Sequence, residues 1–196
     1  MIKIGSLNGF RKMEQGEARG DPGEGTRELT HEILETQSLE DLKDNPIVTS
    51  FFRLGPNADP KKITFSGSTF ARTQESEDIY IYCMTLQPSR KAMRAFHADT
   101  CVRIDNAAAF LDAITECLKT RDLHERGIMW KRCYYAPRSM PWDAEGMTGV
   151  NPAFLKAPQL AYQKEVRAAW LPKSYPIQSE IFECSELTKY VRLYTF

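Results

Sequence analysis

The stretch Ile79-Tyr80-Ile81-Tyr82-Cys83-Met84 decides the fold of this chain. It is almost continuously apolar and rich in β-branched and aromatic residues. Such runs are typical of a strand that is covered on both faces of a sheet. We therefore expect residues 79–84 to form a central strand, around which the remaining elements are arranged.

Further strand signals lie on both sides of this run. The predicted strands are residues 2–7, 47–53, 62–66, 100–104, 128–135, 162–170 and 187–194. Turn-rich residues 55–60 predict that the second and third of these form a hairpin. Residues 30–44 indicate helix or irregular structure, residues 16–25 a glycine-rich loop, and residues 137–152 a long loop that could cover a cleft.

One helix is predicted with a clear start. Asp105 or Asn106 can cap it, and the apolar residues that follow fall on one side of a helix. These residues are Phe110, Ile114, Cys117 and Leu118. Strands outnumber helices and do not alternate with them regularly, so we expect an α+β fold with a mixed or antiparallel sheet core and few helices.

Composition narrows the class of protein. A length of 196 residues, 42% of them hydrophobic, favours one globular domain that spans residues 1–196. The 26 basic and 26 acidic residues cancel, which argues against a dedicated duplex-DNA binder. No apolar run approaches the roughly 18 residues that span a bilayer, and no signal peptide is evident. We expect a cytoplasmic protein without a membrane partner.

Cysteine and histidine usage gives little support to a metal site. His31, His97 and His124 lie far apart, with no ligand spacing around them, so we predict no metal. The five cysteines are odd in number and scattered, and they predict buried, reduced thiols. They are Cys83, Cys101, Cys117, Cys133 and Cys184.

The segment Tyr162-Gln163-Lys164-Glu165-Val166-Arg167 carries the strongest chemical signal. On a strand, residues two apart point to the same face, so Gln163, Glu165 and Arg167 would project together. A carboxylate between an amide and a guanidinium can bind a sugar hydroxyl and stabilise a developing positive charge. The alternative is an exposed strand on which Glu165 and Arg167 form a surface ion pair.

Three segments in order along the chain carry a resemblance to a known group of proteins. They are residues 2–11 with Asp21-Pro22-Gly23-Glu24-Gly25, then Tyr80-Ile81-Tyr82-Cys83-Met84-Thr85, then Phe154-x-Lys156 with residues 162–167. Together they resemble mostly uncharacterised bacterial and phage proteins with an ADP-ribosyltransferase-like fold. In that group the corresponding elements are an Asp-Pro-x-Glu loop, an aromatic-Cys-hydroxyl strand and a Phe-x-Lys, Tyr-Glu-x-Glu-x-Arg signature.

The resemblance implies an enzyme that cleaves NAD, used as a substrate, and transfers ADP-ribose to a protein or nucleic-acid acceptor. A toxin or phage-host conflict setting would fit such an activity. Glu165 would be the catalytic carboxylate and Gln163 would orient the acceptor. Residues implied to hold the NAD are Arg11, Arg53, Ser66, Ser68, Tyr82, Tyr162 and Arg167. The early basic residue of the family could correspond to Lys3, Arg11 or Arg53, and the two serines are a loose match to its aromatic-Ser-x-Ser/Thr strand.

Two other classes of function stay open at this point. The chain could be a non-catalytic binding or assembly protein that keeps the fold without the cofactor pocket. It could also bind nucleic acid through Arg90, Lys91 and Arg94, although short charged runs are more often solvated loops.

Overall fold

The main sheet is built around β6 (Tyr80–Thr85) in the computed structural model, which describes residues 1–12, 23–144, 146 and 149–195. The strand order is β13-β1-β6-β12-β8, and every pairing in this sheet is antiparallel. β6 lies between β1 (Ile2–Ser6) and β12 (Glu165–Pro172), and the edge strands are β13 (Glu180–Phe182) and β8 (His124–Arg132). The predicted central strand and the sheet-rich α+β class with few helices are confirmed.

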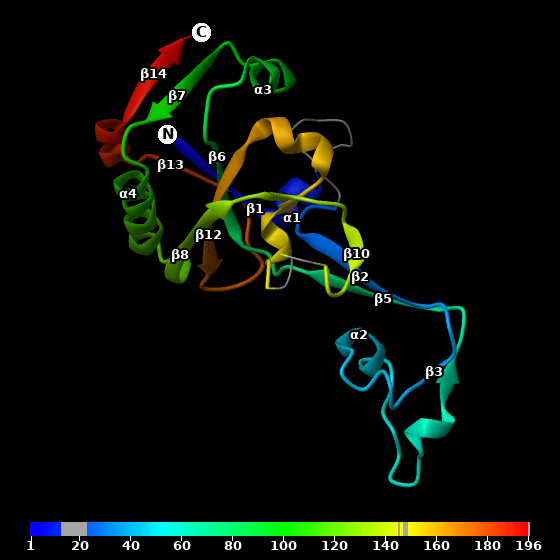
Figure 1. The fold of residues 1–196 in the computed structure, drawn as a ribbon. Helices are drawn as coiled ribbons and strands as arrows, with labels where there is room; N and C mark the ends of the chain where they lie inside the picture. The colour runs from blue at the N-terminus through cyan, green and yellow to red at the C-terminus, as the bar shows by residue number, and fades with distance from the viewer. Residues whose placement is uncertain (13–22, 145, 147–148, 196) are drawn as a thin grey trace.

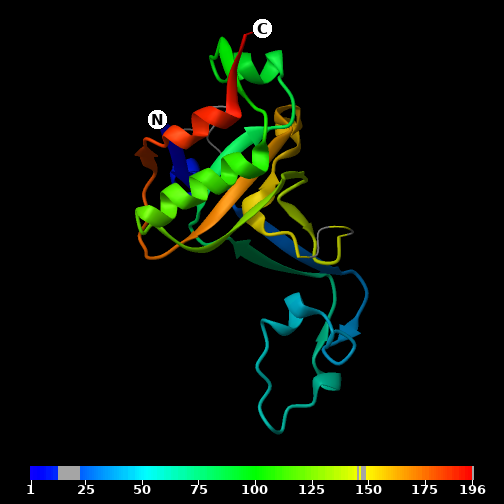
Figure 2. The same ribbon diagram turned by 90° about the vertical axis from the view of Figure 1, so that its left-hand side faces the viewer.

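Helix α4 (Ala107–Thr120) covers one face of this sheet (Figure 2). The side chain of Asn106 accepts a hydrogen bond from the amide of Ala109, which caps the helix as predicted. Its apolar side packs on the sheet in the largest core cluster, which includes Ile4, Tyr80, Phe110, Ile114, Leu118, Ala168 and Trp170. The indole of Trp170 donates to Thr115 Oγ1 at 2.9 Å, so its one polar atom is satisfied inside this core.

The opposite face of the sheet is covered by loops and short helices. Leu7, at the start of α1 (Leu7–Arg11), packs there with Phe154 from the 3-10 helix η2 (Pro152–Phe154). The chain then forms β11 (Leu155–Lys156), which runs parallel to β9 (Tyr134–Tyr135). The 3-10 helix η3 (Pro158–Gln163) leads directly into β12. This face carries the candidate site.

A long hairpin leaves the body and ends in a projecting arm (Figure 1). Its two strands, β2 (Thr26–Ile33) and β5 (Ser68–Glu75), pair over their full length, and β10 (Ser139–Pro141) runs parallel to β2. Residues 34–67, which we call the arm, connect the strands. The arm holds β3 (Gln37–Ser38), α2 (Pro46–Thr49), η1 (Pro60–Lys62) and β4 (Thr64–Phe65) around a small core that includes Leu39, Leu42 and Val48.

The remaining elements lie at the other end of the molecule (Figure 1). Strand β7 (Thr100–Ile104) pairs with β14 (Val191–Thr195), and α3 (Arg90–Ala95) precedes β7 in the chain. The 3-10 helix η4 (Ser185–Tyr190) packs beside α4. Cys117 of α4 and Cys184 form a disulfide there, so the prediction of reduced thiols is wrong for this pair. Cys83, Cys101 and Cys133 are free.

Several predicted elements differ from the structure. Residues 47–53 are not a strand, because Asn45 caps and Pro46 begins the short helix α2, and β4 pairs with β3 instead. Within 30–44, residues up to Ile33 continue β2. The last strand pairs with β7 and does not finish the main sheet. Most of the predicted loop at 16–25 lies outside the described residues.

Candidate functional site

Four buried charged side chains meet on the loop-covered face of the sheet. They are Glu24, Lys156, Glu165 and Arg167, each less than a tenth exposed. Lys156 Nζ lies 2.6 Å from Glu165 Oε2, and Arg167 Nε lies 2.5 Å from Glu165 Oε1. Arg167 also reaches Glu24 Oε1 through Nη1 at 2.5 Å. We call this alternating chain of two acids and two bases the ionic cluster.

Gln163 joins the ionic cluster, although not in the predicted way. We expected Gln163 and Glu165 to share one strand face, but the strand begins only at Glu165. Lys164, with φ of 45°, ends the preceding 3-10 helix in the left-handed region. Even so, the side-chain oxygen Oε1 of Gln163 accepts a hydrogen bond from Lys156 Nζ at 2.9 Å. Lys156 therefore links the two side chains.

A tight turn carries Glu24 into the ionic cluster. Arg11 donates through Nε to the carbonyl of Glu24 at 2.6 Å and through Nη2 to the carbonyl of Gly25. Gly25 has φ of +69°, and a Cβ there would lie 2.6 Å from Leu7 Cδ2. Only glycine fits this position without displacing its neighbours. The Gly-Glu-Gly sequence thus positions a carboxylate that would otherwise sit in an exposed loop.

Three members of the ionic cluster, Lys156, Glu165 and Arg167, are charged at neutral pH. Burial alone would raise the pKa of Glu165, but Arg167 and Lys156 outweigh it and lower this pKa from 4.5 to about 2. Burial opposes the charge of Lys156 as well, yet Glu165 raises the pKa of this lysine. The pKa of Arg167 is also raised, because Glu165 and Glu24 more than offset its burial. Each of these three charged groups lies within 2.6 Å of a group of opposite charge.

Two cysteines and a tyrosine border the ionic cluster. Burial raises the pKa of Cys133 to about 12, so this thiol is protonated. Cys133 is therefore not a ready nucleophile, whereas Cys83 is exposed on the same face of the sheet as Arg167. Tyr135 accepts a hydrogen bond from the backbone amide of Glu165 at 2.7 Å and fixes the start of β12.

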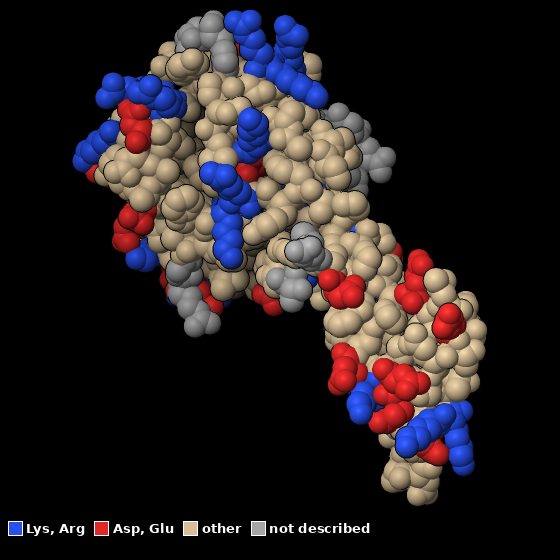
Figure 3. All heavy atoms as spheres, in the orientation of Figure 1, with Lys and Arg blue, Asp and Glu red and all other residues tan. Residues whose placement is uncertain are grey.

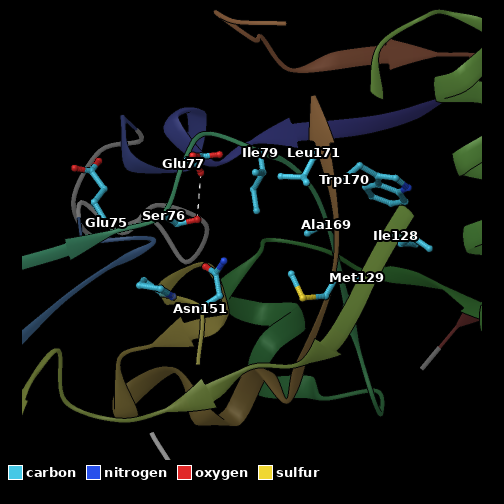
Figure 4. Close-up of a pocket in the computed structure, with 11 residues that line it drawn as sticks. Glu75, Ser76, Glu77, Ile79, Ile128, Met129, Asn151, Ala169, Trp170 and Leu171 are labelled. Atoms are coloured by element: carbon cyan, nitrogen blue, oxygen red, sulfur yellow. Dashed lines mark hydrogen bonds between the residues drawn. The ribbon is translucent and has the colours of Figure 1, made fainter. Parts of the chain in front are cut away.

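A hollow of about 600 Å³ opens further along the same face of the sheet (Figure 4). Its walls are mostly apolar, with Ile79, Met129 and Ala169 among them, and its rim includes Glu77 and Asn151. Ala169 is four residues beyond Glu165, about 13 Å along the strand. Arg167 lies between them in the chain, and Glu165 does not line the hollow.

The residues predicted to hold NAD do not all converge. Arg167 belongs to the ionic cluster, whereas Arg11 is engaged with backbone carbonyls and with Glu75. The structure separates three others from the cluster, because Arg53 and Ser66 lie on the arm and Ser68 begins β5 beside it. These three residues therefore lie on or next to the projecting arm, away from the main sheet that carries Glu165.

The two predicted tyrosines are also apart from the carboxylate. Tyr82 packs against Phe110, with ring centroids 5.7 Å apart, on the face covered by α4. Alternation along β6 therefore points it away from Glu165. The ring of Tyr162 lies beneath Lys91 Nζ, 4.5 Å from the ring centroid. Neither tyrosine contacts the hollow.

Sequence reasoning gave no role to three residues that the structure brings to this region. Glu24 and Lys156 are part of the motifs quoted above. Each is a charged residue among apolar residues or glycines, and this pattern could have indicated a buried, functional charge. Lys131 of β8 is directly opposite Arg167 in the register and is exposed. Its side chain shares the sheet face of Glu165 and Arg167, which no local pattern reveals.

Comparison with known proteins does not identify the chain. It matches no protein-family model, and no curated protein or solved structure is significantly similar to it. Among the described residues, no three or more His, Cys, Asp or Glu side chains gather as metal ligands would. No helix within that part of the chain has the length and apolarity to cross a membrane.

Proposed function

We propose that this protein has an ADP-ribosyltransferase-like fold and cleaves NAD at the bond between nicotinamide and ribose, with Glu165 as the catalytic carboxylate. The observation that carries the proposal is the convergence of three separated motifs. The Gly-Glu-Gly turn supplies Glu24, the Phe-x-Lys segment supplies Lys156, and the Gln-x-Glu-x-Arg segment supplies Glu165 and Arg167. If the three short motifs had matched by chance, their charged residues would not be expected to contact one another in one ion network.

The chemistry requires a carboxylate that is charged, and Glu165 meets that requirement at any physiological pH. As the C1′–N bond breaks, its electron pair moves to the nicotinamide nitrogen and positive charge builds on the ribose. A fixed negative charge beside the ribose stabilises this state more than the ground state. The acceptor then forms a bond to C1′ and loses a proton, with Gln163 orienting it.

Within the ionic cluster, Lys156 is the partner that the ribose would replace. Arg167 is held by Glu24 and by the carbonyl of Ala153 as well as by Glu165. Within the described part of the chain, the Lys156 ammonium group is held by two side chains, those of Glu165 and Gln163. A ribose hydroxyl that donates to Oε2 would take the position of the ammonium group, and the displaced Lys156 and exposed Lys131 would offer charge to the pyrophosphate.

The test compares two carboxylates of the same network. Purified protein is incubated with NAD and candidate acceptors, and released nicotinamide is measured by chromatography. Glu165→Gln should lower the rate about 100-fold or more, a typical effect of losing transition-state stabilisation. Glu24→Gln breaks the same buried network without touching the reacting atoms, so it should retain far more activity. Equal losses in the two variants, or no nicotinamide release by wild type, would refute the proposal.

A non-catalytic binding or assembly protein is the second candidate function. The observation that favours it is that the hollow does not touch Glu165 and that Arg11 is committed to internal contacts. The ionic cluster would then serve only to lock three segments together. A melting temperature that stays unchanged at millimolar NAD supports this second function, and a raised one favours the enzyme.

A further inference from the structure

Six exposed cationic side chains surround the start of β12. They are Arg90, Lys91 and Arg94 of α3, Lys131 and Arg132 of β8, and Lys164. Figure 3 shows Lys and Arg side chains gathered over α3 and β8, while acidic side chains are prominent on the arm. We call these six residues the basic face.

Three chain segments that contact one another carry the basic face. The amide of Leu86, before α3, donates to the carbonyl of Lys164 at 3.1 Å, and Lys91 lies over the ring of Tyr162. At the end of β8, the amide of Cys133 donates to the carbonyl of Glu165 at 2.9 Å. The segments that carry the six cations are therefore neighbours. Lys131 and Arg132 project from opposite faces of β8, and because β8 is the edge strand of the main sheet, they flank that edge.

The charge of this surface is not compensated locally. Residues 86–98, 128–135 and 157–164 contain no aspartate or glutamate, although the whole chain has 26 acidic and 26 basic residues. No ion pair joins any of the six cations to another described residue. Like charges held together without partners create a positive potential that attracts a polyanion.

Exposed aromatic rings accompany these cations and narrow the choice of polyanion. Trp130 shares one face of β8 with Arg132, two residues further along, and is 51% exposed. Tyr134 follows in the chain and is 45% exposed. Large aromatic rings open to solvent beside cations are the arrangement on which unpaired bases stack, while phosphates meet the charges. An acidic protein or an anionic membrane would use the cations but would gain little from the stacking faces.

We propose that the basic face binds single-stranded nucleic acid, with its cations on phosphates and with Trp130 and Tyr134 stacked on bases. This binding does not depend on NAD chemistry. The strand would cross the end of β8 and the start of β12, next to α3. The net charge of the chain does not reveal the basic face, because acidic residues elsewhere, including those of the arm, balance its positive charge.

Fluorescence anisotropy with a labelled oligonucleotide of about 16 nucleotides tests the proposal over a range of salt concentrations. If all six cations meet phosphates, log K should fall against log salt with a slope of about −4, since each contact with a single strand contributes about −0.7. The double variants Arg90→Gln/Arg94→Gln and Lys131→Gln/Arg132→Gln should each reduce the slope to about −3 and weaken binding at least tenfold. Trp130→Leu should weaken binding without changing the slope.

The matched control removes two exposed lysines from the arm. Lys61→Gln/Lys62→Gln changes the net charge by the same amount and should leave binding unchanged. The proposal is overturned if wild type does not bind, if this control weakens binding as much as the basic-face variants, or if Trp130→Leu has no effect. Equal affinity for polyglutamate or for vesicles rich in anionic lipid would also overturn it and would indicate an acidic protein or a membrane.

Discussion

Protonation of Glu165 should remove a defined part of the stability of this protein. Its folded pKa is about 2, against 4.5 for the ordinary group, because Arg167 and Lys156 outweigh the effect of burial. A carboxyl whose pKa is depressed on folding stabilises the protein above the unfolded pKa and loses this contribution as the pH falls toward the folded value. At about 1.4 kcal/mol per pH unit, the contribution is about 3 kcal/mol.

The assay is urea unfolding between pH 7 and pH 2, followed by tryptophan fluorescence. Wild type and Glu165→Gln are compared, because glutamine keeps the shape and does not titrate. The advantage of wild type should be constant above about pH 4.5 and should shrink by about 3 kcal/mol as the pH approaches 2. Glu32→Gln, at an exposed position of β2, serves as the control and should follow the wild-type pH dependence.

A parallel decline of wild type and Glu165→Gln across this window would contradict the assignment. It would mean that the carboxyl titrates alike in the folded and unfolded states, so that the ionic cluster does not hold its charge. Both the catalytic role of Glu165 and its structural role would then lose their basis.

Three further perturbations have definite expected outcomes. Gly25→Ala should lower the free energy of unfolding, measured by urea titration, by about 2 kcal/mol or more. The reason is that alanine is strained at φ of +69° and that its Cβ would contact Leu7. An unchanged urea midpoint would count against the tight turn. Reduction of the Cys117–Cys184 disulfide, which joins residues 67 apart, should cost about 2–4 kcal/mol, whereas a Cys117→Ser variant should not respond to reductant. Replacing the arm, residues 34–67, by an Asn-Gly turn should leave a folded body with an unchanged acid transition of Glu165, and an unfolded product by circular dichroism would show that the arm is required.

The elements that could be predicted were those whose local signals agree with their surroundings. The run at 79–84 has both the apolarity and the β propensity of a central strand, and Asn106 with the spaced apolar residues after it fully specifies α4. Local signals conflict in the arm. There Asn45 and Pro46 start a helix, although the residues that follow favour a strand.

The candidate site could be predicted only in part. Glu165 and Arg167 were recognised, because alternation along a strand brings them together. The place of Gln163 depends on one left-handed residue, Lys164, which no periodicity indicates. Glu24 is 143 residues away from Arg167 in the chain, so their contact follows from the tertiary fold alone. The same reason explains why the Cys117–Cys184 pairing was missed.

The position of β1 in the main sheet has a consequence for the synthesis of this protein. Its two neighbours are β6 and β13, which come from residues 80–85 and 180–182. During synthesis, β1 must therefore wait for β13 before both of its edges are paired. Until then its unpaired edge offers a template for pairing with strands of other chains, which favours aggregation of the partly synthesised protein.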